Sequence, residues 1–122
     1  MTTSPPTNNQ PADKEEFEPL YDNVEAWVDA VYTTTFARLA RARWCPQWWA
    51  HPEAVLRLTA LWQSWELARA QPGGFADWLA RLFDPINQRL IAEDGPFSAC
   101  TKERHTAATP WPNTYAPEGH WG

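Results

Sequence analysis

The sequence lacks the features that mark membrane, secreted and strongly nucleic-acid-binding proteins. Its 122 residues contain no apolar run near the roughly 20 residues that a membrane span needs, and no apolar N-terminal signal segment. Two cysteines are too few for a disulfide scaffold. The chain has ten Lys and Arg and fifteen Asp and Glu, a net charge of -5, so the totals indicate no strongly charged partner. We therefore expect a cytoplasmic protein.

The common catalytic patterns are also missing. The chain has no Gly-rich phosphate loop, no helical HExxH and no serine flanked by glycines. A hydrolase built on Cys45 and His51 would need a partner in space that the sequence does not place. The sequence therefore favours a protein that is not an enzyme.

Tryptophan and proline are what the chain has in abundance, with nine and twelve copies. Residues 43–53 alone hold three tryptophans, a cysteine, a histidine and two prolines. Three indoles left in water would forgo a large gain from burial, and the prolines prevent a single helix. We call residues 43–53 the aromatic knot and predict that it connects two helices.

The remaining chain divides by composition. Residues 1–16 are polar and Pro-rich, and residues 101–122 are rich in Pro, Thr and Gly, so we predict two disordered tails around a domain at 17–100. No stretch alternates with period two for long enough to be a strand. The predicted fold is all-α, a small Trp-rich bundle of about four helices.

Local signals set the expected helix limits. Asp22 and Glu25 form a capping box for a first helix, which the arginines at 38, 41 and 43 would close. The second helix should begin at Pro52 and end before the turn at 71–74. The third should cover 75–82, and Asp84 followed by Pro85 should cap a separate fourth helix that ends at 94–96.

A metal site is the sharpest chemical hypothesis. Cys45 and His51 lie six positions apart at the knot, and Cys100 and His105 lie five apart near the end of the domain. Two cysteines and two histidines can hold one structural zinc tetrahedrally, and a small domain gains from such a staple. Two alternatives stay open: buried apolar thiols with His51 capping the second helix and His105 in the tail, or a Cys45–Cys100 disulfide.

Nucleic acid is an alternative partner. Arg38, Arg41 and Arg43 stand beside Trp44 and Trp48, a combination that suits phosphate contacts and base stacking. Against it, residues 17–100 carry seven arginines and ten carboxylates, whereas dedicated binders usually show a basic domain or face. A solvated basic helix end explains the arginines equally well.

A protein partner is the other reading of the tryptophans. Nine indoles are difficult to bury in so small a core, and exposed Trp is enriched at interfaces. Trp62 and Trp65 on the second helix and Trp111 in the C-terminal tail are the candidates, with Tyr115 and Trp121 further along that tail. A Trp-rich core, or a tail lying on its own domain, remains the alternative.

One string carries a family resemblance. It is Arg43-Trp44-Cys45-Pro46-Gln47-Trp48-Trp49 followed by His51-Pro52-Glu53-Ala54, supported by Trp62, Trp65-Glu66, Trp78, Asp84-Pro85, Asp94-Gly95-Pro96-Phe97 and Cys100. The chain resembles the actinobacterial domain-of-unknown-function 4913 family across nearly all of 17–105. That resemblance implies a small helical protein found on plasmids, conjugative elements and phages, with no established activity. We therefore expect a non-enzymatic interaction module that serves a mobile element, with a nucleic-acid-associated accessory protein as the alternative.

Overall fold

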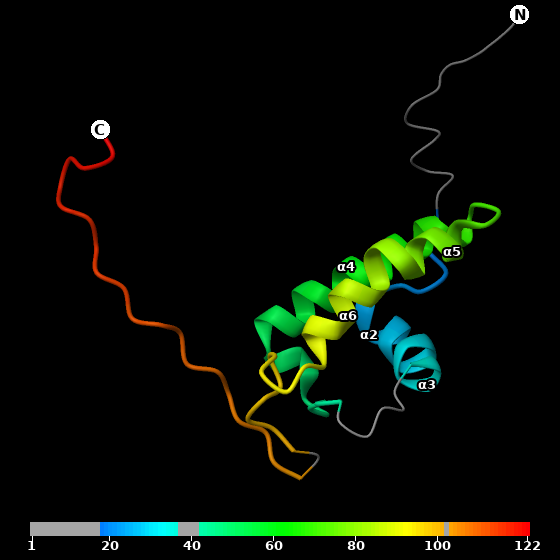
Figure 1. Cartoon of the computed structure of the whole chain (residues 1–122), viewed down its shortest axis with the longest axis horizontal. Helices are drawn as coiled ribbons and strands as arrows, with labels where there is room; N and C mark the ends of the chain where they lie inside the picture. The colour runs from blue at the N-terminus through cyan, green and yellow to red at the C-terminus, as the bar shows by residue number, and fades with distance from the viewer. Residues whose placement is uncertain (1–17, 37–41, 102) are drawn as a thin grey trace, which may run out of the picture.

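The computed structural model describes residues 18–36, 42–101 and 103–122 (Figure 1). Within them the chain is helical and contains no strand. A first helix is followed by the aromatic knot, a long second helix and a third helix that runs back along it. This confirms the all-α class, with three helices and a 3-10 turn at Trp48–Ala50 where about four helices were expected.

The first helix consists of α2 (Val24–Trp27), a π-helical turn (Val28–Tyr32) and α3 (Thr33–Thr35). Its N-cap is Asn23, whose side-chain oxygen accepts a hydrogen bond from Ala26 N at 2.9 Å, so the N-cap lies one residue after the predicted Asp22 and the residue three positions later is Ala26, not the Glu25 of the predicted capping box. The threonine run ends the helix. Thr34 Oγ1 donates to Ala30 O, a bond that competes with the helical ladder.

The arginines predicted to close this helix do not do so in the part of the chain that the structure describes. Arg38 and Arg41 lie outside the described residues. Arg43 is exposed and non-helical, and its backbone N–H donates to the carbonyl of Ile91 at 3.0 Å. Arg43 thus begins the knot and attaches it to the end of the third helix.

The second helix, α4 (Pro52–Arg69), confirms the strongest local prediction. Pro52 occupies its first turn, where a missing N–H is harmless. Gly73, at φ 74°, reverses the chain after it. Gly74 then passes so close to α4 that a Cβ built there would lie 2.2 Å from the carbonyl oxygen of Ala68. The two helices therefore pack as a tight hairpin.

The predicted third and fourth helices form one rod: α5 (Gly74–Trp78), a π-helical turn (Leu79–Phe83) and α6 (Asp84–Leu90). The predicted N-cap at Asp84 is wrong, because Asp84 is helical and its N–H bonds to Leu79 O, five residues back. The wider π turn lets Pro85 enter without breaking the helix. On this rod Trp78 is buried, whereas Phe75, Leu79 and Leu82 remain 39–41% exposed.

The core lies where the three helices meet the knot. Its fully buried side chains include residues from every element, namely Trp27, Leu58, Leu61, Leu90, Cys45 and Phe97. Beyond Cys100 the chain has no regular helix or strand, apart from turns, in its described part, and it runs away from the helices (Figure 1). In the described residues, no helix is both long and apolar enough to span a membrane.

Candidate metal centre

The knot supplies two of the four candidate ligands. Cys45 precedes Pro46, and the short 3-10 turn Trp48–Ala50 then brings His51 back toward it, just before α4 begins. Trp48 in that turn is buried, so burial of its indole fixes the path between the two ligands. Cys45 is 0% exposed and His51 2%.

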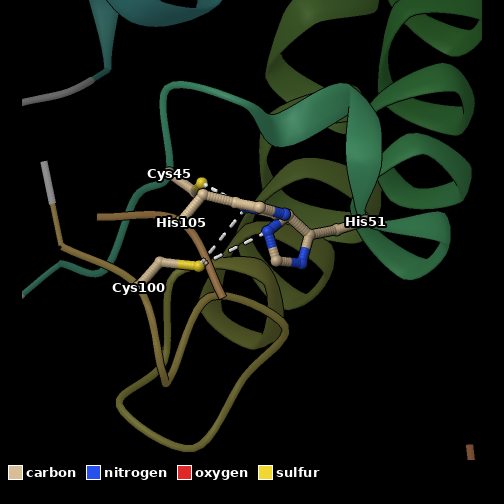
Figure 2. Close-up of side chains that lie close together, drawn as sticks. All are labelled: Cys45, His51, Cys100 and His105. Atoms are coloured by element: carbon tan, nitrogen blue, oxygen red, sulfur yellow. Dashed lines mark hydrogen bonds between the residues drawn. The ribbon is translucent and has the colours of Figure 1, made fainter. Parts of the chain in front are cut away.

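The segment after α6 supplies the other two. Phe97 is fully buried and anchors the turns that lead to Cys100, which is 2% exposed. Backbone hydrogen bonds in both directions between Thr101 and Arg104 then close a small loop. This loop returns the half-buried His105 to the cluster, where Figure 2 shows all four side chains pointing at one another.

The donor atoms have the spacing of a single metal site. Cys45 Sγ lies 3.2 Å from His105 Nδ1, and Cys100 Sγ lies 3.4 Å from His51 Nε2 and 3.9 Å from His105 Nδ1. All four donor atoms fall within 4.8 Å of one another. In tetrahedral zinc, bonds of about 2.3 Å to sulfur and about 2.0 Å to nitrogen place S and N roughly 3.5 Å apart. The observed distances lie on either side of that value.

The arrangement also distinguishes one ion from a cluster. A Rieske-type [2Fe–2S] centre puts two cysteines on one iron and two histidines on the other. Here each thiol has a histidine as its close neighbour, Cys45 with His105 and Cys100 with His51. The four residues therefore surround one point and can bind a single metal ion. Both cysteines are free thiols in the structure.

Burial shifts the pKa of two candidate ligands, Cys45 and His51. Burial raises the pKa of the Cys45 thiol, a backbone N–H from Gln47 lowers it, and the neighbouring Cys100 raises it further, for a net increase. Burial lowers the pKa of His51, as does the charge of nearby His105. A neutral imidazole is the form that binds metal, and a dication between the thiols would offset the penalty on their ionised form.

Backbone N–H groups point at both sulfurs. Gln47 N–H contacts Cys45, and Thr106 N donates to Cys100 Sγ at 3.4 Å. Such N–H···S bonds stabilise thiolates around a metal. His51 Nδ1 is buried without a hydrogen-bond partner among the described residues, while the Phe97 ring packs edge-on against the imidazole at 5.1 Å. His51 therefore has a nitrogen for the cluster, Nε2, and is oriented by packing.

The model of a domain of unknown function, DUF4913, matches residues 17–118. The chain belongs to the DUF4913 family. This confirms the family resemblance, and the DUF4913 match continues past the helices, through all four candidate ligands and into the C-terminal tail. Neither the curated proteins nor the solved structures gave a match.

The structure thus brings together all four residues predicted as metal ligands. His105 lies beyond the predicted domain end at residue 100, yet its ring stacks edge-on against His51 at 4.8 Å between centroids. His51 is the N-cap residue of α4, as the alternative to the metal site predicted, but its side chain makes no capping hydrogen bond. Instead its backbone carbonyl accepts from Val55 N at 3.0 Å.

Of the residues proposed for nucleic acid, the three that the structure describes do not form one exposed surface. Arg43 is exposed, but Trp48 is buried and the half-buried Trp44 packs against Tyr32 and Phe97 with ring centroids 5.5 and 5.1 Å apart. These two indoles serve the core and offer no platform on which a base can stack.

The interaction candidates are divided between core and surface. Trp65 is half-buried between the rings of Tyr21 and Phe75, and Trp62 is half-buried with its indole N–H donating to Glu66 at 3.1 Å. Of these three tryptophans only Trp111 is freely exposed, at 90%.

Sequence reasoning missed Glu66. Its side chain is 2% exposed, and its two oxygens accept hydrogen bonds from four donors: Leu20 N, Tyr21 N, Arg69 Nε and Trp62 Nε1. Burial raises the pKa of this carboxyl, but these bonds lower it by more, so the pKa of Glu66 lies below its usual value. The signal for it was a carboxylate within the apolar stripe of α4, between Trp62 and Arg69.

Proposed function

We propose that this protein is a small, non-enzymatic interaction module whose fold is fixed by one structural Zn²⁺. The observation that supports this is the convergence of Cys45, His51, Cys100 and His105 within 4.8 Å. Two segments separated by α4, α5 and α6 in sequence provide these ligands. A metal between them would join the knot to the end of the domain.

The donor set favours zinc over other metals. Two thiols and two imidazoles around one point are the ligands of a tetrahedral S₂N₂ site, whereas magnesium and calcium require oxygen donors. Thiolate ligation also requires a reducing compartment, because oxidation to a disulfide would remove both sulfurs. The proposal therefore includes a cytoplasmic location.

A structural role agrees with how closed the site is. Zinc held by four protein ligands has no open position for water or substrate, and three of these four side chains are at most 2% exposed. This supports the proposal that the protein is not an enzyme. The described part of the loop from Cys100 to Thr106 is joined to the knot through the candidate ligands, Cys45 with His105 and Cys100 with His51, so zinc would supply much of its attachment.

The interaction role is supported by the exposed aromatic side chains that follow the metal centre along the chain. Directly after it, the chain exposes Trp111, Tyr115 and Trp121 at 90%, 98% and 88%. Large aromatic side chains fully in water are typical of binding segments. An accessory role on a mobile element, which the family resemblance implies, completes the proposal.

Metal content tests the proposal directly. Untagged protein should contain about one equivalent of zinc by elemental analysis and native mass spectrometry. His105→Ala should lose that metal, whereas His120→Ala should keep it, because His120 is exposed and its ring packs only against Trp121 among the described residues. Cobalt substitution should give the near-ultraviolet thiolate charge-transfer bands, which Cys45→Ser should weaken.

Two results would overturn it. Protein that contains no metal, takes up neither zinc nor cobalt, and melts at the same temperature with and without a chelator has no structural metal site. Equal zinc content in the His105→Ala and His120→Ala variants would show that the metal is bound elsewhere.

A further inference from the structure

The C-terminal residues 107–122, which we call the aromatic segment, pack against no helix among the described residues. All sixteen are exposed, and Figure 1 shows the segment running away from the helices. Pro110, Pro112 and Pro117 restrict its backbone, so little conformational freedom would be lost on binding. The DUF4913 match includes it up to residue 118, so the segment is part of the family's pattern.

The helices present a complementary unpaired surface. Two hollows of about 260 and 380 Å³ lie between α4 and the α5–α6 rod. On α4 the lining positions recur at helical spacing along one face, and on the rod Gly74, Trp78, Leu82 and Ile86 recur every four residues, with Asp77 beside them; we call the two hollows together the groove. The residues that give the groove its apolar character are Leu56, Ala60, Leu67, Leu82 and Ile86.

The leucines of this groove are unusually accessible. Leu56 is 72% exposed, Leu67 61% and Leu82 41%. Ala60 and Ser64 between them carry small side chains, which lets an extended chain approach closely. An apolar surface with small residues along its floor suits aromatic side chains projecting from an extended peptide.

The length of the aromatic segment matches the length of the groove. Leu56 and Leu67 are eleven positions apart on α4, about 16 Å at 1.5 Å per residue. The segment from Trp111 to Pro117 covers about 19 Å in a polyproline-like conformation. A turn, closed by His120 N to Pro117 O at 3.0 Å, then brings Trp121 back toward it. The segment is long enough to place aromatics in both hollows.

We propose that the aromatic segment of one molecule binds the α4/α5–α6 groove of a second copy, and that two copies exchange segments to form a dimer. This rests on the proposed function for the partner-binding role, and it names the partner. The occupant belongs to a second molecule because the segment leaves the metal centre directed away from its own helices. Reciprocal exchange gives two such contacts per dimer, each strengthening the other.

The test uses the full zinc-loaded chain and measures its mass by light scattering and sedimentation over a range of concentrations. We expect a dimer. A segment variant with Trp111→Ser, Tyr115→Ser and Trp121→Ser should weaken dimerisation by about thirtyfold or more, the effect of losing at least one interface hot spot. Trp49→Ser, at a tryptophan 59% exposed but outside the segment, should leave it unchanged.

A groove variant with Leu56→Gln and Leu67→Gln should weaken the dimer similarly, while Leu20→Gln should not, since Leu20 is equally exposed at 60% but does not line the groove. The deciding measurement mixes the segment variant with the groove variant. The groove variant keeps the aromatic segment and the segment variant keeps the groove. The mixture should therefore form heterodimers, through one intact contact, at concentrations at which neither variant dimerises alone.

Three outcomes would overturn the proposal: a wild-type monomer at all concentrations, a dimer that survives loss of the aromatic segment, or no heterodimer in the mixture. Zinc content separates this proposal from the previous one. A metal-loaded monomer refutes the segment exchange only, whereas a metal-free dimer refutes the zinc centre only.

Discussion

Replacing Glu66 with Gln tests how strongly this buried carboxylate attaches the segment before α2 to α4. The carboxylate lies inside the domain, where Oε1 accepts from Leu20 N at 2.8 Å and from Arg69 Nε at 2.7 Å, and Oε2 accepts from Tyr21 N at 3.0 Å and from Trp62 Nε1 at 3.1 Å. A glutamine amide has one oxygen. Whichever way it is turned, one pair of donors faces an NH₂ group.

The structure sets the size of the effect. Two hydrogen bonds to a charged acceptor are lost, and the Arg69 guanidinium, whose side chain is 30% exposed, loses its counter-charge. We expect Glu66→Gln to lower the free energy of unfolding by about 3 kcal/mol, a large part of the total for a small domain. With a denaturant slope of about 1.5 kcal/mol/M, the urea midpoint should fall by roughly 2 M.

Glu53→Gln is the matched control. Glu53 is also on α4 and also pairs with an arginine of that helix, Arg57, at 2.8 Å. Its side chain is 47% exposed, against 2% for Glu66. Exposed i,i+4 pairs contribute about 0.3–0.5 kcal/mol, so Glu53→Gln should change stability by no more than about that amount. Burial, and not the ion pair itself, is what the comparison isolates.

Urea unfolding followed by tryptophan fluorescence, with zinc present throughout, provides the assay. Hydrogen exchange adds a local reading, because the amides of Leu20 and Tyr21 should lose protection in Glu66→Gln before the helices do. The reasoning is refuted if the two variants are destabilised equally, or if Glu66→Gln costs less than about 1 kcal/mol.

Three further predictions follow from other features. Since the folded-state pKa of Glu66 is lowered, its ionised form stabilises the fold fully above about pH 4.5, and this contribution is lost as pH falls through the folded pKa. The stability gap between wild type and Glu66→Gln should therefore narrow on acidification, as measured by urea unfolding at each pH; a constant gap would contradict the carboxylate's role. Metal-free protein treated with diamide should form a Cys45–Cys100 disulfide, each thiol losing one hydrogen to the oxidant, because their donor atoms lie within 4.8 Å. Zinc-loaded protein should resist, and mass spectrometry that found no crosslink in either form would argue against the cluster. Gly74→Ala should destabilise by about 2 kcal/mol in thermal melting, as its Cβ would clash with a backbone carbonyl at 2.2 Å; an unchanged melting temperature would contradict the tight packing of α5 against α4.

The local parts of the fold were predictable because short-range chemistry decides them. Pro52 begins α4 and the glycines after Ala70 end it, as predicted from helix-terminus preferences. The choice between Asp22 and Asn23 as N-cap depended on one residue of register, to which composition is insensitive. Asp84 and Pro85 carried a strong start signal that tertiary packing overrode by inserting a π turn.

The sequence by itself determined which residue types were available for a metal, and that Cys45 and His51 lie at the knot while Cys100 and His105 lie near the end of the domain. Only the tertiary structure decided that they meet, because the α4 hairpin between them, closed at Gly74, sets how the two ends of the helical body are placed. The structure also decided which tryptophans stay in water. Trp62 and Trp65 lie on a helix with a packing partner, whereas Trp111 follows the last residue that the core holds. Spacing along the chain describes neighbours within a few residues, while contacts between distant segments depend on how whole helices pack.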